Sequence, residues 1–136
     1  MKIYLASPFF TEFQKALMRR VLKKIRNEGN KVYAPYEHEI ENAWDKTNED
    51  WGREVFFEDI KAIQQCDEVW AINYGMDSDT GTAWECGYAY GIGKTVRVLC
   101  VKSVNSLMVL NGCDEYDFIF NYLYNKESDY FPIEQK

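Results

Sequence analysis

The chain alternates short apolar segments with longer amphipathic ones, and this alternation limits the folds that are open to it. Segments with the length and apolar content of buried strands cover residues 2–6, 31–35, 67–73 and 95–101. Segments with helical periodicity cover residues 11–29, 51–65 and 82–92. Strands that alternate with helices over short connections predict an α/β fold with a parallel sheet and helices on both faces.

Local signals set several boundaries. Thr11 and Gln14 have the spacing of a capping box at the start of the first helix, and Gly29 is placed to end that helix. The polar and acidic residues 36–50 predict a loop with one helical turn. After Val101, the segment SLMVLNG predicts a short helix, while YDFIF fits either a fifth strand or the start of a last helix. All 136 residues are assigned to one domain.

Composition narrows the class of partner. Apolar residues make up 46% of the chain, which argues against disorder. The net charge of −6 argues against nucleic-acid and membrane-surface binding, so a small polar or uncharged partner is expected. No apolar run approaches the roughly 20 residues of a membrane span, and the N-terminus resembles a first strand more than a signal peptide. We therefore expect a cytoplasmic location.

Metal and nucleotide-cofactor motifs are missing from the sequence. The cysteines are well separated and His38 is the single histidine, so a zinc site is not expected and the thiols are expected to be buried and reduced. No G-x-G-x-x-G motif follows the first strand. The sequence Gly93-Lys94-Thr95 resembles the end of a P-loop, but Tyr88 stands where that motif requires glycine.

One helix places an acid where an apolar residue is expected. Asp59 shares a helix face with Val55, Phe56, Ala62 and Ile63, its neighbours three and four positions away. Acids are rarely buried without a partner or a purpose. Asp59 is therefore either a site residue or, if the helix is rotated from the expected register, an exposed acid.

A second acid, Glu85, lies early in the helix that follows the third strand, among small and aromatic residues. Ligands of open α/β sheets bind at the carboxyl edge of such strands, and a helix N-terminus stabilises a carboxylate there. Asp79 precedes this helix as either a capping residue or a site residue. Gly81 lets the backbone come close to a ligand.

Two or three carboxylates in one crevice, without a set of metal ligands, suit chemistry on a glycosidic bond. One acid attacks or stabilises an oxocarbenium-like carbon, and another handles the proton of the leaving group. Phe9, Phe10 and Trp84 are candidates to stack on a flat leaving group, with core packing as the alternative.

Three stretches of the sequence resemble one known family. KIYLASPFF, WGREVFFEDI and DTGTAWECGYAYGIGK are similar to the three signature regions of the nucleoside 2-deoxyribosyltransferases, and the likeness covers residues 2–112. The resemblance implies a flavodoxin-like, doubly wound three-layer sandwich with a mainly parallel sheet of about five strands. It also implies transfer of 2-deoxyribose between purine or pyrimidine bases, without a metal or organic cofactor.

The resemblance also implies the catalytic residues. Glu85 matches the nucleophile that attacks C1′ and forms a covalent deoxyribosyl ester, which a second base attacks with retention of configuration. Tyr4 matches the tyrosine whose hydroxyl orients this glutamate. Asp59 and Asp79 match the two aspartates that contact base and sugar, one of which manages the proton of the departing base. The sequence does not divide these roles between the two aspartates.

Further substrate contacts follow from the same resemblance. Phe9 and Phe10 match the aromatic lining of the base pocket, and Gly81 lies within the third signature region. The base-contacting region of the family aligns with YEHE, so His38 or Glu39 is expected to face the base.

Family members assemble as dimers and hexamers, in which an N-L-M segment reaches a neighbouring subunit's site and holds the 5′-hydroxyl. Here Leu107 and Met108 align with the end of that segment, and either Asn105 or Ser106 takes the place of its asparagine. A homo-oligomer with sites completed by a neighbouring subunit is therefore expected.

Two alternatives remain at this point. The first is an N-glycoside hydrolase of the same superfamily, acting on deoxynucleosides or deoxynucleotides; the segment SPFFTEFQ lacks the Arg and Gly of a phosphate cradle, which counts against a nucleotide substrate. The second is a nucleotide-sensing module without turnover, against which the joint presence of Tyr4, Asp59, Asp79 and Glu85 counts.

Overall fold

Five parallel strands form one sheet in the computed structural model, which describes residues 1–38, 47–75, 79–104 and 106–124. The sheet contains β1 (Lys2–Ala6), β2 (Lys31–Tyr33), β3 (Glu68–Asn73), β4 (Thr95–Cys100) and β5 (Glu115–Phe118). The strand order is β2-β1-β3-β4-β5, and every neighbouring pair is parallel. This order is the flavodoxin-like one, which confirms the predicted fold class.

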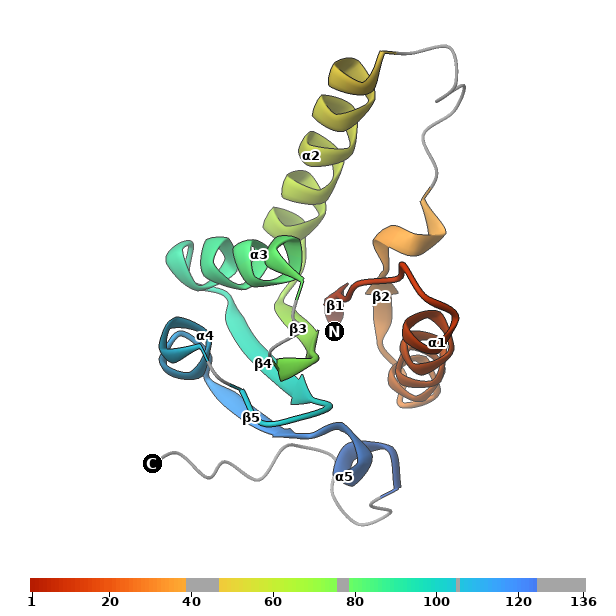
Figure 1. Cartoon of the computed structure of the whole chain (residues 1–136), viewed down its shortest axis with the longest axis vertical. Coiled ribbons are helices and arrows are strands. Elements are labelled where there is room, and N and C mark those ends of the chain that lie inside the picture. Colours follow the sequence, from red (N-terminus) through yellow and green to blue (C-terminus); the bar gives the residue numbers. More distant parts are fainter. Residues whose placement is uncertain (39–46, 76–78, 105, 125–136) are drawn as a thin grey trace.

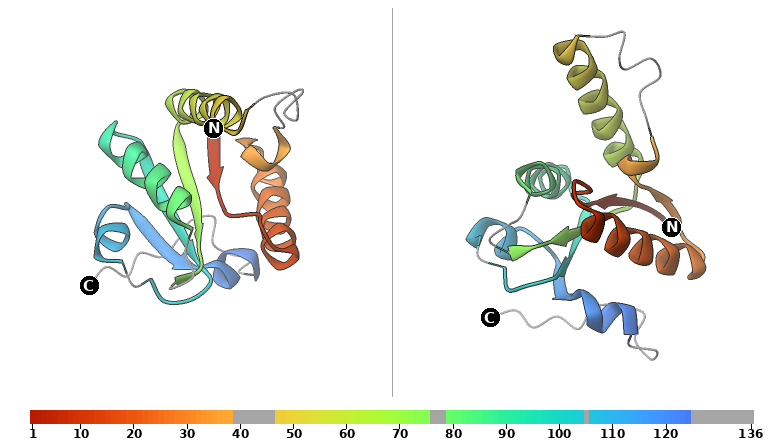
Figure 2. Two further views of the ribbon diagram at one scale, coloured as in Figure 1. Left: turned by 45° about the horizontal axis from the view of Figure 1, so that its top comes forward. Right: turned by 45° about the vertical axis from the view of Figure 1, so that its right-hand side comes forward.

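Helices cover both faces of the sheet (Figures 1 and 2). The helices are α1 (Glu12–Asn27), α2 (Asn48–Gln65), α3 (Thr80–Gly91), α4 (Leu107–Asn111) and α5 (Ile119–Tyr124). The helices α1 and α5 pack on one face through a core that includes Leu17, Trp70 and Leu99. The helices α2 and α3 pack on the other face, around Tyr4 and Ile63. The protein is therefore a three-layer sandwich with two hydrophobic cores.

Capping explains most differences between predicted and observed helix ends. The capping box of Thr11 and Gln14 forms, and Gly29 follows the end of α1 with a φ of +93°. The helix predicted to start at residue 51 starts at Asn48, because the Thr47 side chain accepts a hydrogen bond from the Asp50 N–H. The helix predicted to start at residue 82 likewise starts at Thr80, directly after its capping residue.

The structure defines the secondary structure of two segments that the sequence left less certain. The strand expected over residues 31–35 ends at Tyr33, and Pro35 opens the short 3-10 helix η1 (Pro35–Glu37), which is the predicted helical turn. The segment YDFIF is both of its alternatives, because β5 ends at Phe118 and α5 begins at Ile119.

The strand order places a crevice at the carboxyl edge of the sheet. From β1 the chain turns to β2 on one side, whereas β3 pairs with β1 on the other side. The segments that leave β1 and β3 therefore diverge, and ligands of such folds bind at this switch in strand order. Among the described helices, none is long and apolar enough to cross a membrane.

Candidate active site

A cavity of about 720 Å³ opens at this switch in strand order, and we call it the edge cavity. Its walls come from five places: the segment after β1, the first turn of α1, the η1 region, α2, and the start of α3. Four carboxylates line it, those of Glu58, Asp59, Asp79 and Glu85. The acids that sequence analysis singled out on two different helices thus meet in one cavity.

Glu85 is held by a single strong hydrogen bond from the sheet. Tyr4 lies in β1, is fully buried, and donates its hydroxyl to Glu85 Oε2 at 2.5 Å. Burial and the nearby carboxylates of Glu85 and Asp59 raise the pKa of Tyr4, so this hydroxyl keeps its proton and remains a donor. Tyr4 therefore fixes one carboxylate oxygen of Glu85 and leaves the other available to a ligand.

The surroundings of Glu85 hold its proton unusually tightly. Burial raises its pKa to about 7, the Tyr4 hydrogen bond opposes this rise, and the charges of Asp59 and Asp79 add to it. No ion pair between Glu85 and a Lys or Arg occurs within the described ranges. Near neutral pH the group is consequently poised between the acid and the carboxylate.

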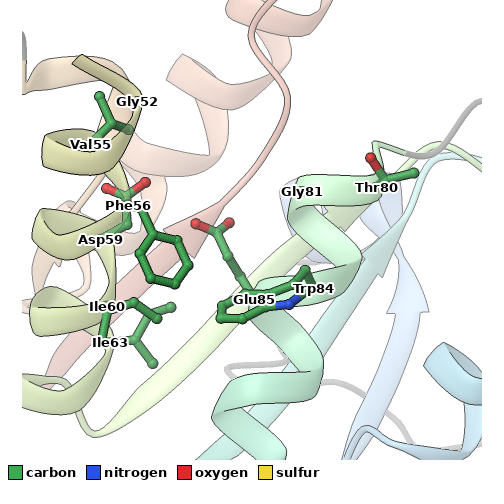
Figure 3. A pocket seen from close by; sticks show the side chains of 10 residues that line it. All are labelled: Gly52, Val55, Phe56, Asp59, Ile60, Ile63, Thr80, Gly81, Trp84 and Glu85. Atoms are coloured by element: carbon green, nitrogen blue, oxygen red, sulfur yellow. The ribbon is translucent and has the colours of Figure 1, made fainter. Parts of the chain in front are cut away.

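Asp59 is the partly buried acid that the apolar face of α2 predicted. Burial raises its pKa to about 6, the neighbouring Glu58 adds to the rise, and the Tyr4 hydroxyl opposes it. Figure 3 shows the carboxylates of Asp59 and Glu85 pointing into the space between α2 and α3. The two acids therefore titrate as neighbours in one site.

Asp79 is both a capping residue and a cavity residue. Its Oδ2 accepts hydrogen bonds from Thr82 N at 2.9 Å and from Thr82 Oγ1 at 3.1 Å, which caps α3. A side chain at Gly81 would place its Cβ 3.0 Å from the same oxygen, so glycine leaves room for this cap. Asp79 thus caps α3 and also lines the edge cavity.

A second cavity, of about 520 Å³, lies between α2 and α3 and shares Asp59 and Glu85 with the edge cavity. We call it the apolar cavity, because Phe56, Ile60 and Trp84 line it (Figure 3). The two carboxylates are therefore reached from two sides.

The side of the edge cavity opposite α2 and α3, which carry the acids, is aromatic and includes a cation. Phe9, Phe10 and Tyr36 contribute rings, and Lys15 contributes an ammonium group from the first turn of α1. Phe10 is 74% exposed, so its ring is free to pack against a bound molecule. Flat apolar faces beside carboxylates suit a nucleobase joined to a sugar.

Comparison with protein families gives a match over most of the chain. The family model described as nucleoside 2-deoxyribosyltransferase matches residues 3–121. The chain belongs to this family. The match extends beyond the three signature regions and includes every described site residue named so far.

Solved structures agree with this membership. The 2-deoxyribosyltransferase of Bacillus psychrosaccharolyticus is 32% identical, with a TM-score of 0.82 over 100% of this chain and 99% of that one. A conserved protein of Enterococcus faecalis V583 is 25% identical over 73% of this chain and 62% of that one, with a TM-score of 0.63. The CMP N-glycosidase BcmB of Clostridium botulinum is 18% identical over 94% and 100%, also with a TM-score of 0.63, and shares the fold. No curated protein sequence matches the chain.

Most residues that the family resemblance proposed lie at the edge cavity. Its lining includes Phe9, Phe10, His38, Asp59, Asp79, Gly81 and Glu85, and Tyr4 contacts it through Glu85. Trp84, a stacking candidate in the sequence, lines the apolar cavity instead and stacks on Tyr88. Glu39 and Asn105 lie outside the described residues.

Of the described residues that the family resemblance assigned to substrate binding, those at α4 lie away from the acids of this chain. Ser106 caps α4 by accepting a hydrogen bond from the Val109 N–H, and Met108 is 83% exposed. Neither lines the edge cavity or the apolar cavity. Ser106 and Met108 therefore lie away from both cavities that contain the acids.

Sequence reasoning missed several residues of the site. Trp51 and Val55 line the edge cavity with Asp59, and their spacing of four along α2 was a signal available in the sequence. Tyr33 was missed too, although KIY and KVY begin strands that pair residue by residue. Lys15 gave no sequence signal, because it looks like any basic residue of an amphipathic helix.

Proposed function

We propose that this protein transfers 2-deoxyribose between nucleobases through a covalent ester on Glu85. The strongest support is the 2.5 Å hydrogen bond from the Tyr4 hydroxyl to Glu85, at a cavity lined by further carboxylates and aromatic rings. A nucleophilic carboxylate must be oriented without being neutralised by a salt bridge, and a neutral hydroxyl does this. Membership of the family and the likeness to a 2-deoxyribosyltransferase support the same reaction.

The first step breaks the glycosidic bond. The free oxygen of Glu85 forms a bond to C1′, and the electron pair of the C1′–N bond leaves with the base. The departing base needs a proton, and we assign its delivery to Asp59, because its carboxyl lines the same cavity and its raised pKa of about 6 leaves a fraction of it protonated near neutral pH. Asp79, which caps α3 through Oδ2, has Oδ1 left to accept a hydrogen bond from base or sugar.

The second step reverses the first with a different base. An incoming base attacks C1′ from the side that the first base left, Asp59 takes up its proton, and Glu85 is released. Two displacements at one carbon retain its configuration. The cycle therefore needs Glu85 ionised and Asp59 protonated at the start.

These protonation states predict a bell-shaped dependence of kcat on pH. The form with one proton on the pair is most populated between the pKa of Asp59, about 6, and that of Glu85, about 7. Because Glu85 has the higher pKa, the reactive form with the proton on Asp59 is a minor part of this population, and it rises and falls with the whole. Activity should fall on both sides of that interval, which initial rates at constant ionic strength will show. A kcat that is level from pH 5 to pH 9 (about one unit or more beyond each side) would contradict the assignment.

The reaction itself is tested by base exchange. The protein is mixed with deoxyinosine or thymidine and a second free base, and both bases are followed by chromatography. We expect a new deoxynucleoside with wild-type protein and none with Glu85→Ala, while Glu49→Ala, which removes an exposed acid of α2, keeps the activity. Absence of reaction with every purine and pyrimidine deoxynucleoside would contradict the proposal.

Hydrolysis is the outcome that the same assay separates from transfer. The fold is shared with a CMP N-glycosidase, and Lys15 places a cation in the edge cavity. If water takes the place of the second base, base release proceeds at a rate that is independent of the added acceptor. Deoxynucleoside 5′-monophosphates are included as substrates to cover this alternative.

The proposed assembly is a homo-oligomer in which a second copy completes each site. Leu107 and Met108 on α4 are 74% and 83% exposed, which is unusual for adjacent large apolar side chains. The apolar cavity between Phe56 and Trp84 offers apolar surface beside Glu85. The α4 segment of a neighbouring copy would bury both surfaces and bring Ser106 towards the sugar.

A further inference from the structure

Three aromatic rings form a stack that ends at the tyrosine that orients Glu85, and we call it the ring column. The rings of Tyr4 and Tyr33 lie 5.6 Å apart between centroids and are tilted by 10°. The rings of Tyr33 and His38 lie 4.0 Å apart and are tilted by 7°. The column therefore runs from the edge cavity, which His38 lines, to the buried Tyr4.

The backbone dictates this arrangement. Tyr4 and Tyr33 are partners in the parallel register of β1 and β2, so their side chains leave the sheet on the same face. The chain then turns through η1, where the His38 N–H donates to Pro35 O at 3.0 Å, and this turn returns the imidazole to the Tyr33 ring. Each ring is thus placed by a different element.

We propose that Tyr33 is a positioning residue, which fixes the ring of Tyr4 and thereby aims its hydroxyl at Glu85, with His38 clamping Tyr33 from the cavity side. The inference rests on the proposed function, since it assigns the column a part in the attack by Glu85. The strand places the Cβ of Tyr4 but leaves its ring free to rotate, and a parallel ring at 5.6 Å limits that rotation.

The charges near Tyr33 agree with a place inside the site. Burial raises the pKa of Tyr33 to about 12, and the carboxylates of Asp59 and Glu58 add to the rise. Tyr33 therefore stays neutral beside the acids that take part in the reaction. Among the described residues, Glu85 accepts its hydrogen bond from the Tyr4 hydroxyl, so the Tyr33 ring acts on Glu85 through Tyr4.

The test removes the ring while leaving the catalytic groups in place. We expect Tyr33→Leu to lower kcat about tenfold to a hundredfold with KM changed less than about twofold, and Tyr33→Phe to keep activity within about twofold. In a Tyr4→Phe background, which lacks the hydroxyl to be aimed, Tyr33→Leu should change kcat by less than about twofold. Tyr122→Leu, a buried tyrosine of the other core, is the matched control for a general loss of packing.

A second readout follows the Glu85 pKa without turnover. The Tyr4 hydrogen bond lowers the pKa of Glu85, so a misaimed hydroxyl lets this pKa rise. The melting temperature changes with pH as Glu85 titrates, and we call the midpoint of that change the pH midpoint. We expect Tyr33→Leu to move the pH midpoint up by about 0.5 to 1 unit. Tyr122→Leu should lower the melting temperature at every pH without moving this midpoint. If Tyr33→Leu does not fold, the same pH midpoint measured in His38→Ala and His38→Phe tests the column from its exposed end, with a rise expected for Ala and none for Phe.

Equal losses of kcat for Tyr33→Leu with and without the Tyr4 hydroxyl would overturn the inference, and so would an unmoved midpoint. A loss in Tyr33→Phe equal to that in Tyr33→Leu would also overturn it, because the hydroxyl and not the ring would then matter. These outcomes leave the proposed function intact whenever the wild type exchanges bases. A wild type without exchange activity would instead contradict the proposed function, while the unfolding midpoint still decides whether the column aims Tyr4.

Discussion

At the scale of single residues, the site depends on a carboxylate that is buried without a cation. Glu85 keeps its reactivity because its one strong partner is the neutral hydroxyl of Tyr4, so the charge is oriented but not neutralised. Burial is what makes this arrangement costly, since it raises the pKa of Glu85 from 4.5 to about 7. The folded protein consequently holds a proton that the unfolded chain releases at lower pH.

This proton has a consequence for stability. Between pH 4.5 and about 7 the folded state binds more protons at Glu85 than the unfolded state, so the free energy of unfolding falls as pH rises through this window. Glu85→Gln removes the charge and keeps an acceptor for Tyr4. We expect it to raise the free energy of unfolding by about 1–3 kcal/mol at pH 8 and to change it little at pH 4, while abolishing activity.

Denaturant unfolding at the two pH values checks this expectation, with Glu49→Gln as the matched change of an exposed acid of α2. A Glu85→Gln variant that is less stable than wild type at pH 8 would show that burying the ionised carboxylate does not destabilise the fold.

At the scale of elements, helix ends supply the geometry that the acids need. Capping by Asp79 starts α3 at Thr80, which places Glu85 in the second turn, facing β1. Periodicity in the sequence predicted the helix and its acid, but the start was placed at residue 82, because a capping aspartate and a site aspartate look the same in a sequence. The apolar face of α2 predicted that Asp59 points inward, and the structure places it partly buried at the cavity, since the neighbours at three and four positions decide which way a helical side chain points.

The two roles of Asp79 are separable by substitution. Asp79→Asn retains a side-chain oxygen for the Thr82 N–H, whereas Asp79→Ala leaves the end of α3 uncapped and should cost about 1 kcal/mol of stability. We therefore expect thermal melting of Asp79→Asn to resemble that of the wild type, with its base-exchange activity reduced about tenfold or more.

Thr47→Ala, which removes the cap of α2 away from the acids, is the control for capping alone. Full activity in Asp79→Asn would restrict Asp79 to a structural role.

At the scale of the whole molecule, the sheet order brings distant segments together in one place. The alternation of strands and helices predicted a parallel sheet, and right-handed crossovers predicted helices on both faces. The strand order itself came from the resemblance to a family, because strands of similar length and apolar content do not show in their sequences which strands pair with each other. The ring column was beyond prediction for the same reason, since it requires the register of β1 and β2 and the turn at η1.

The exposed apolar surfaces belong to this scale too. The helix α2 projects beyond the rest of the fold (Figure 1), and Phe56, Phe57 and Trp84 are each 46% exposed or more. Together with Met108 on α4, these exposed side chains form the surface that we propose an identical copy covers.

A charge on α4 should disrupt that assembly. We expect Met108→Glu to lower the oligomeric state seen by sedimentation and to reduce activity, with activity recovering as protein concentration rises. Phe120→Glu, which changes an exposed apolar residue of α5 on the other face of the sheet, should leave both unchanged. A fully active monomer of Met108→Glu would show that each chain carries a complete site.

The most direct test of the account is the covalent ester on Glu85. Wild-type protein is mixed with a deoxynucleoside in the absence of an acceptor base, quenched with acid, and measured by intact-protein and peptide mass spectrometry. We expect a mass increase of one deoxyribosyl group, located on the peptide with Glu85, which disappears when an acceptor base is added and is absent in Glu85→Ala. Base exchange by wild-type protein with no adduct at Glu85, or with an adduct on a different residue, would contradict it.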